Sequence, residues 1–201
     1  MAETAPRAWQ RMLSGRRLDL LDPSPLDVEI EDIAQGLSRL ARWNGQTRGK
    51  WPFSVAQHCL LVEELAGALA PGLEPRWRLC ALLHDAPEYV IGDLISPFKA
   101  AVGLDYRAFE ERLFTAILIR FSLPAVLPKK VSALIKRSDQ AAAFLEATQL
   151  AGFSSSEARR YFRRPRRLQL DAAHFPLEPL PPGAAKAAFL ARFAQLFERG
   201  C

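Results

Sequence analysis

Residues 79–88 have the sequence LCALLHDAPE, an apolar run that ends in a histidine beside an aspartate. Charged side chains are seldom buried unless they are paired or bind a metal. An adjacent His-Asp pair is common by chance, however, and a single buried histidine is more often a core residue than a ligand. The importance of His84 and Asp85 therefore depends on two residues that lie far from them in the sequence.

His58 and Asp139 complete a candidate metal site. Each is expected on an apolar face of a different helix, which is how metal sites between packed helices are built. With His84 and Asp85 they offer two imidazole nitrogens and two carboxylate oxygens, a set that suits one Co, Mn, Zn, Ni or Fe ion better than Ca or Mg. Four protein ligands leave positions open for water and a substrate oxygen, which favours hydrolysis. Glu88, three residues after Asp85, is placed to orient that water or to move its proton.

The composition is that of an ordinary globular protein. The 201 residues are 49% hydrophobic and 24% charged, which predicts one domain. No apolar run is long enough to span a bilayer, and the first residues lack the order of a signal peptide, so we expect a cytoplasmic protein without membrane contact. The three cysteines show no C-x-x-C spacing, which argues against a disulfide framework or a structural zinc site.

The net charge of +5 comes from one segment. Its arginines account for more than the whole excess, and Tyr161 and Phe162 between them could stack on bases. RNA or DNA binding is therefore the non-enzymatic alternative. The run is short and has no second basic patch beside it, so a solvated or phosphate-facing loop explains it as well, and we expect no nucleic-acid partner. The arginines are Arg159, Arg160, Arg163, Arg164, Arg166 and Arg167.

The first part of the chain predicts an arm and a helix. Residues 14–30 hold a glycine and two prolines between short apolar segments, which predicts an irregular arm or a small hairpin. From Glu31 the apolar residues recur at helical spacing, and Asn44-Gly45 supplies a stop. Arg42 and Trp43 are then expected at the C-terminal end of this helix.

Two further helices should carry the histidines. Residues 54–57, SVAQ, form a predicted capping box that starts a helix running to about residue 71, which places His58 in its first turn. Pro75 suits the first position of the next helix. Pro87 should end or kink that helix just after His84-Asp85.

The remaining boundaries complete an all-α prediction. Asp105 is expected to cap a fourth helix, and a fifth is expected from near Pro128 to Gly152 with Asp139 on its apolar face. A Pro-rich segment leads to a closing helix whose phenylalanines are core or a dimer surface. We expect residues 1–28 to be an N-terminal arm, 29–152 the core, and 153–201 an Arg/Pro-rich segment with the closing helix packed on that core.

Several ordered segments resemble the HD-domain metal-dependent phosphohydrolases, specifically their bacterial 5′-deoxynucleotidase-like branch. The resemblance covers roughly residues 29–150. Its segments are RW at 42–43, SVAQH at 54–58, HDAPE at 84–88, GDLISPFK at 92–99 and KRSD at 136–139.

The resemblance implies a single-domain HD-type helical bundle with one divalent metal between core helices. It also implies a homodimer, the common assembly of this branch. It implies that Glu88 is the catalytic acid or base, acting beside Asp85. Only one further histidine, His174, is present, which favours a mononuclear site. The implied metal ligands are His58, His84, Asp85 and Asp139.

The resemblance also implies substrate contacts by Arg42, Trp43 and Asp93, to which we add Lys99. Structural alternatives stay open for three of them. Trp43 could belong to the core, Arg42 could cap a helix C-terminus, and Asp93 could serve the turn at Gly92-Asp93.

The leading functional prediction is hydrolysis of (deoxy)nucleoside 5′-monophosphates to nucleoside and phosphate. The enzymatic alternative is a dNTP triphosphohydrolase that releases triphosphate. Extra cations reaching the β- or γ-phosphate would favour that alternative. The candidates are Lys50, Lys99, Lys136 and Arg137.

Overall fold

The computed structural model describes residues 8–93, 106–162 and 173–200 and confirms the all-α prediction. Two short strands, β1 (Trp9–Arg11) and β2 (Arg17–Asp19), form an antiparallel hairpin. Two 3-10 turns, η1 (Pro25–Asp27) and η2 (Arg42–Gly45), precede the main bundle. The helices are α1 (Ile30–Leu37), α2 (Val55–Leu69), α3 (Pro75–Leu82), α4 (Glu88–Ile91), α6 (Tyr106–Arg120), α7 (Lys129–Gln149), α8 (Ser155–Tyr161) and α9 (Pro182–Gly200).

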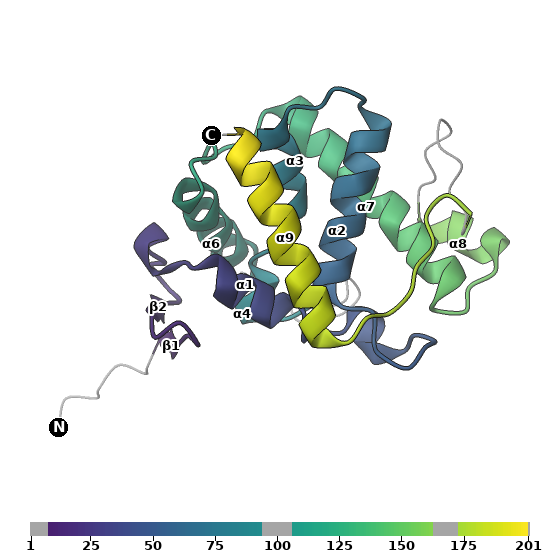
Figure 1. Ribbon diagram of the computed structural model, residues 1–201, viewed down its shortest axis with the longest axis horizontal. Helices are drawn as coiled ribbons and strands as arrows, with labels where there is room; N and C mark the ends of the chain where they lie inside the picture. The colour runs from purple at the N-terminus through teal and green to yellow at the C-terminus, as the bar shows by residue number, and fades with distance from the viewer. Residues whose placement is uncertain (1–7, 94–105, 163–172, 201) are drawn as a thin grey trace.

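The helices form a bundle around α2 (Figure 1), whose side chains contribute to two apolar clusters. α9 packs across α1, α2 and α3, and their apolar side chains form the larger cluster together with α6 and the start of α7. The other side of α2 packs along α7, where a smaller cluster extends to α8. α2 is therefore covered on both sides, which explains why His58 in its first turn is fully buried.

A buried carboxylate joins three helices of the larger cluster. Glu63 of α2 is only 3% exposed and accepts two hydrogen bonds of 2.8 Å from Arg192 of α9. Arg78 of α3 lies 2.5 Å from the same carboxylate. The buried charge is thus paired on two sides, as a buried carboxylate requires.

The predicted arm is a hairpin that packs on the bundle. Leu18 of β2 is fully buried, and the Ser14 hydroxyl and backbone N–H both donate to Asp32 of α1. Arg120, at the end of α6, donates to the carbonyl of Val28. These contacts fix the segment between the hairpin and α1.

The first helix is shorter than its sequence pattern predicts. α1 ends at Leu37, so Arg42 and Trp43 lie in the separate turn η2 and not at the helix C-terminus. The backbone of Arg42 instead donates to the carbonyl of Phe53, and this pairing takes the chain away from the helix axis. Trp43 has a positive φ of 57°, a left-handed conformation that is rare for a bulky residue.

The capping box predicted for α2 is half right. The Ser54 side chain accepts from the Gln57 backbone N–H at 3.3 Å, which confirms the N-cap. The Gln57 side chain does not return to Ser54. It donates to the carbonyl of Glu178 and accepts from the N–H of Leu180, because the extended segment before α9 offers it two backbone partners.

The boundaries around the His-Asp pair differ in one respect from the prediction. α3 begins at Pro75 as expected but ends at Leu82, before His84 and Asp85. Those two residues lie in a turn, and Pro87 precedes the short helix α4, which begins at Glu88. The turn, and not a continuous helix, therefore sets the spacing between His84 and Glu88.

The later helices largely agree with the sequence prediction. α7 begins directly after Pro128, and Phe189 and Phe193 of α9 are buried in the larger cluster, which makes them core residues. The predicted cap Asp105 lies outside the described residues. A helix that was not predicted, α8, begins with a capping box between Ser154 and Glu157.

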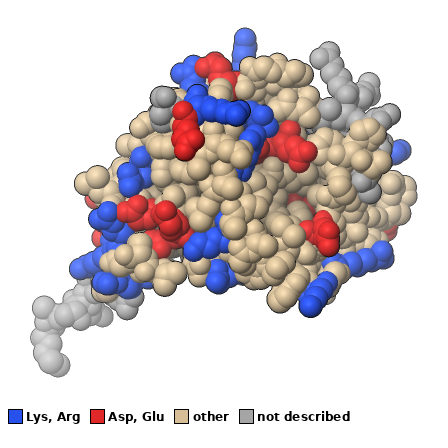
Figure 2. All heavy atoms as spheres, in the orientation of Figure 1, with Lys and Arg blue, Asp and Glu red and all other residues tan. Residues whose placement is uncertain are grey.

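Charge on the visible face of the molecule is mixed. Figure 2 shows basic and acidic side chains interspersed among uncharged ones, without an extended area of one sign. Among the described residues, no helix is both long and apolar enough to cross a membrane.

Candidate metal centre

The turn after α3 fixes the orientation of His84. Its Nδ1 lies 2.9 Å from the carbonyl oxygen of Ala81. A carbonyl oxygen can only accept, so Nδ1 carries a proton and Nε2 is the atom left to bind a metal. This outer hydrogen bond is of the kind that orients metal-binding histidines.

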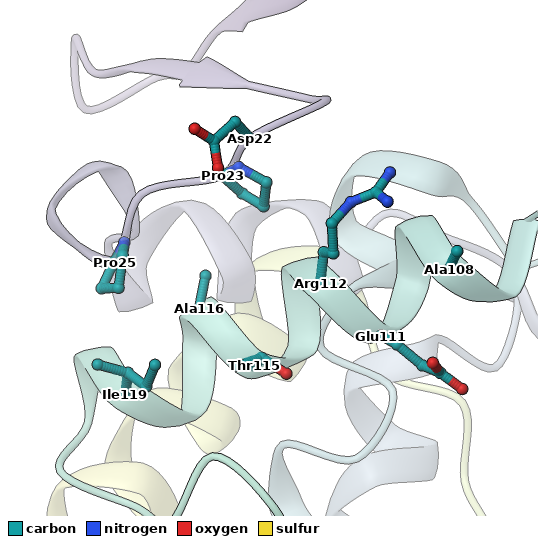
Figure 3. A pocket seen from close by; sticks show the side chains of 9 residues that line it. All are labelled: Asp22, Pro23, Pro25, Ala108, Glu111, Arg112, Thr115, Ala116 and Ile119. Carbon is teal, nitrogen blue, oxygen red and sulfur yellow. The ribbon is translucent and has the colours of Figure 1, made fainter.

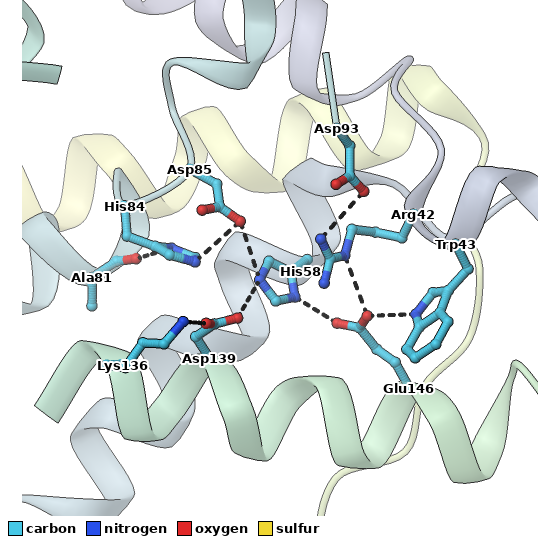
Figure 4. A network of polar contacts seen from close by, with 10 residues as sticks. All are labelled: Arg42, Trp43, His58, Ala81, His84, Asp85, Asp93, Lys136, Asp139 and Glu146. Carbon is cyan, nitrogen blue, oxygen red and sulfur yellow. Dashed lines mark hydrogen bonds and ion pairs between the residues drawn. The ribbon is translucent and has the colours of Figure 1, made fainter. Parts of the chain in front are cut away.

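His58 is oriented in the same way from the other side. Its Nδ1 lies 2.5 Å from Oε1 of Glu146, a carboxylate that is fully buried on α7. Nδ1–H donates to this oxygen, so Nε2 faces away from Glu146, as Figure 4 shows. Both histidines therefore present Nε2 to the same space.

Two carboxylates face these nitrogens. Oδ2 of Asp85 lies 3.2 Å from His84 Nε2 and 3.4 Å from His58 Nε2, and Oδ1 of Asp139 lies 3.5 Å from His58 Nε2. Ligand atoms from His58, His84 and Asp139 all lie within 4.8 Å of one another. Four residues from α2, the turn after α3, and α7 are thus brought together (Figure 4).

This arrangement fits a divalent metal ion. The Nε2 atoms of His58 and His84 are buried and have no hydrogen-bond partner among the described residues. Adjacent ligands about 2.1 Å from one ion and at right angles to each other are roughly 3.0 Å apart, close to the separations found here. An ion would satisfy both nitrogens at once, so the donor set and its geometry agree with the predicted transition metal.

The electrostatics of the cluster also favour a cation. Burial lowers the pKa of His84, but the Asp85 carboxylate outweighs burial and raises this pKa to about 10. Burial raises the pKa of Asp139, yet its contact with His58 brings that pKa well below the usual range. The carboxylates are therefore ionised at neutral pH and stabilise positive charge between the imidazoles.

Glu146 is the site residue that sequence reasoning missed. It follows Asp139 by seven residues, two helical turns along α7, and so lies on the same face. Its Oε2 accepts from Trp43 Nε1 at 2.8 Å and from Arg42 Nε at 3.3 Å. Burial raises the pKa of Glu146, but the charges of Arg42 and His58 and the hydrogen bonds from His58 and Trp43 lower it to about 2. The i, i+7 spacing from Asp139 was the available signal.

The predicted substrate residues of η2 are held by carboxylates. Arg42 Nη1 lies 3.2 Å from Oδ2 of Asp93, and its Nε contacts Glu146. The Trp43 ring packs against Phe153 and Phe162, with ring centroids 5.8 and 5.7 Å away. Arg42 and Asp93 thus face each other beside the cluster, and Trp43 contributes to the smaller apolar cluster.

The structure describes some of the other predicted residues and not others. Glu88 is 4% exposed, and its backbone N–H donates to the carbonyl of Asp85 at 3.0 Å, so it lies directly after the candidate ligands. Arg159 and Arg160 belong to α8. Lys99 and the four arginines from 163 to 167 lie outside the described residues.

A cavity of about 280 Å³ adjoins the metal centre. Three of the proposed ligands, His84, Asp85 and Asp139, line it. Its walls come from α6, α7 and the segment between them, and are formed by Phe114, Leu127, Ser132, Ile135 and Lys136. The centre is thus accessible to a small molecule from this side.

A second cavity lies elsewhere. It measures about 430 Å³ and separates the segment around Pro23 and Pro25 from α6 (Figure 3). Although this cavity is larger, the described residues that line it include no histidine and no member of the candidate metal cluster. We therefore place the chemistry at the smaller cavity.

Comparison with known proteins agrees with the site. The family model of the HD domain matches residues 55–122, which include His58, His84 and Asp85, while Asp139 lies beyond the match. An uncharacterized protein of Rhodobacter capsulatus is 57% identical over 186 residues, or 92% of this chain and 94% of that protein. The uncharacterized protein YfdR of Escherichia coli is 33% identical over 111 residues, 54% of this chain and 57% of YfdR. This chain therefore belongs to the family of the Rhodobacter capsulatus protein, and its HD domain indicates a metal-dependent hydrolase.

Proposed function

We propose that the protein is a metal-dependent phosphohydrolase that converts (deoxy)nucleoside 5′-monophosphates to nucleoside and phosphate. The main support is the pair of buried Nε2 atoms of His58 and His84, which have no hydrogen-bond partner among the described residues and face the carboxylates of Asp85 and Asp139 beside a cavity. The proposed ligands are these two histidines with Asp85 and Asp139. A bound divalent ion would polarise the phosphate and lower the pKa of a bound water.

Glu88 is the proposed general base and acid. It follows Asp85 by three residues and is buried at the start of α4, so its carboxylate acts next to the ligands. Glu88 accepts a proton from the attacking water as the new bond to phosphorus forms. The bond from phosphorus to the 5′ oxygen breaks, and the same carboxyl group returns the proton to the departing nucleoside.

The walls of the cavity suit the two halves of a nucleotide. Phe114, Leu127 and Ile135 offer apolar surface to a nucleoside. Lys136 also lines the cavity; its Nζ is 3.2 Å from Oδ2 of Asp139 and its side chain is 70% exposed. We propose that Lys136 binds a phosphate oxygen of the substrate.

Arg42, Asp93 and Trp43 are proposed to complete the substrate site from the opposite side of the metal. Asp93 and Glu146 hold the Arg42 guanidinium through Nη1 and Nε, which fixes its plane toward an anion. Lys99 remains a proposed contact from the sequence.

A monophosphate is favoured over a triphosphate. Of the described cations considered for a longer phosphate chain, Lys136 lines the cavity, whereas Lys50 and Arg137 do not. A cavity of about 280 Å³ also suits a small ligand. The dNTP triphosphohydrolase stays the second candidate because Lys136 would serve either substrate.

The proposed homodimer would use a surface other than the apolar face of α9. Phe189 and Phe193 are buried within the chain, whereas Leu21, Leu26 and Ile119 are 64%, 75% and 49% exposed. Light scattering on the purified protein measures the assembly. A monomer at all concentrations would contradict the dimer.

Metal-reconstituted hydrolysis of ribo- and deoxyribonucleoside mono- and triphosphates tests the function. Phosphate, triphosphate and nucleoside are measured separately for the wild type, Asp139→Asn and Asp22→Asn, the last being an exposed control in the distant cavity. We expect phosphate from monophosphates, loss of turnover in Asp139→Asn, and no change in Asp22→Asn. Triphosphate release would support the alternative, and no metal-dependent turnover would refute both.

A further inference from the structure

Glu146 connects two parts of the site that are far apart in sequence. One carboxylate oxygen, Oε1, accepts from His58 of α2. The other, Oε2, accepts from Trp43 and Arg42 of η2. Figure 4 shows the carboxylate between the imidazole on one side and the indole and guanidinium on the other.

All three partners of Glu146 are donors. His58 Nδ1, Trp43 Nε1 and Arg42 Nε each present an N–H toward a carboxylate oxygen. Glu146 is fully buried, so water does not supply an alternative acceptor from the surface. An ionised carboxylate accepts on both oxygens, which makes it the side-chain group that satisfies all three donors at once.

The turn η2 depends on this acceptor. Trp43 and Asn44 have φ values of 57° and 51°, so two consecutive non-glycine residues are left-handed. Such conformations persist only where surrounding contacts hold them. The indole hydrogen bond of 2.8 Å to Glu146, with the packing of the Trp43 ring on Phe153 and Phe162, supplies such contacts.

We propose that Glu146 is a shared positioning residue, which fixes His58 as an Nε2 metal ligand and at the same time holds the Arg42-Trp43 turn in place. The inference rests on the metal centre of the proposed function and extends it. Glu146 is not among the residues that line the cavity, and its two oxygens contact His58, Arg42 and Trp43, so it acts through these residues. Metal affinity and the shape of the turn are therefore coupled through one carboxylate.

Glutamine at this position cannot replace both contacts. If its amide oxygen accepts from His58, its NH2 group faces the N–H groups of Trp43 and Arg42. If the amide is reversed, its NH2 group donates to His58 Nδ1 and forces the imidazole proton onto Nε2, the ligand atom. Glu146→Gln therefore disturbs the turn or blocks the metal position, and removal of the Trp43 donor relieves part of the conflict.

The test is the affinity of the metal-free protein for Co²⁺, followed by its visible absorption and independent of any turnover. The variants are Glu146→Gln, Trp43→Phe, and the two combined. Glu63→Gln is the matched control, because Glu63 is also buried and paired with two arginines but lies in the larger cluster. Thermal unfolding shows that each variant is folded.

We expect Glu146→Gln to weaken Co²⁺ binding by about 10–100-fold, as loss of an outer partner of a ligating histidine does. In the Trp43→Phe background the same change should have a smaller effect. Glu63→Gln should lower the unfolding temperature and leave Co²⁺ affinity unchanged.

Three results would overturn the inference. They are unchanged Co²⁺ affinity in folded Glu146→Gln, an equal effect in both backgrounds, or no Co²⁺ binding by the wild type. If Glu146→Gln does not fold, Glu146→Asp replaces it. The shorter side chain keeps the charge but cannot reach both His58 and the Arg42-Trp43 turn. Wild-type Co²⁺ affinity in Glu146→Asp would then refute the proposal. Co²⁺ binding with the expected pattern but no nucleotide turnover would reject the proposed function alone.

Discussion

Gly36 lies in α1 where this helix touches α4, and Gly36→Ala should force the two helices apart. An added Cβ would lie 2.7 Å from Cβ, 2.9 Å from the carbonyl oxygen and 3.0 Å from Cα of Tyr89. Two of these three atoms are backbone, so a change of side-chain rotamer cannot relieve the contact. α4 begins at Glu88, the residue before Tyr89, and must shift with it.

The size of the effect follows from these distances. Carbon atoms pack at about 3.5–4.0 Å, so the helices must separate by roughly 0.8 Å. Overpacking of this kind costs about 1–3 kcal/mol, and the better helix propensity of alanine recovers up to about 1 kcal/mol. We expect a net loss of about 1–2 kcal/mol in the free energy of unfolding. Glu88 lies in the shifted helix, whereas the ligands His58 and Asp139 lie on α2 and α7, so kcat should fall more than Co²⁺ affinity.

Urea unfolding of the wild type, Gly36→Ala and Gly183→Ala measures this loss. Gly183 is the matched control, since it lies in α9 and its added Cβ meets nothing within 4 Å. Gly183→Ala should equal or slightly exceed the stability of the wild type. The reasoning is refuted if Gly36→Ala is as stable as the wild type, or if both variants lose the same amount.

Three further predictions concern the charged groups of the site. The pKa of Glu146 is about 2 in the folded chain against 4.5 ordinarily, so its ionisation contributes about 3 kcal/mol above pH 4.5 and this is lost as the pH falls toward 2. In metal-free urea titrations, the difference in unfolding free energy between wild type and Glu146→Gln should therefore shrink by pH 3 to less than half of its value above pH 4.5. A difference that does not change with pH would contradict this prediction. Lys136→Ala should raise KM for a nucleoside monophosphate about 3–10-fold, as expected for loss of one charge-assisted contact. Lys130→Ala, on the same helix, should leave KM unchanged. Equal KM values for Lys136→Ala and the wild type would show that Lys136 does not bind the phosphate. Because the pKa of His84 is about 10, Co²⁺ must displace its proton, so affinity should rise from pH 6 to pH 9, and a flat profile in the absorption titration would count against His84 as a ligand.

Local sequence signals predicted the helix starts that depend on local chemistry. Ser54 caps α2 and Pro75 opens α3, because a side-chain oxygen or a proline acts within one turn of its own position. Where a distant partner competes, the same kind of signal fails. Gln57 binds the segment before α9 and not Ser54, since two backbone groups of that segment are within its reach.

The end of α1 shows the same competition in the backbone. Helical spacing continues beyond Leu37, but the chain leaves the helix there and Arg42 pairs with Phe53. Such pairing between separated segments has no signature in either segment alone. The left-handed Trp43 was unpredictable for that reason, because a bulky residue adopts this conformation only when tertiary contacts hold it.

The candidate site was predicted in part. His58, His84, Asp85 and Asp139 combine residue types that rarely share apolar helical surroundings without a purpose, so chemistry alone singled them out. Glu146 was missed because a lone glutamate on a long helix is ordinarily solvent-exposed, and its burial follows from the packing of α7 on α2.

Anomalous diffraction from crystals of the wild-type chain grown with Co²⁺ tests the metal centre most directly. We expect one peak at the cobalt edge, about 2.0–2.2 Å from Nε2 of His58 and His84 and from a carboxylate oxygen each of Asp85 and Asp139. A peak that excludes His58 and His84, or no peak at a saturating Co²⁺ concentration, would contradict the account.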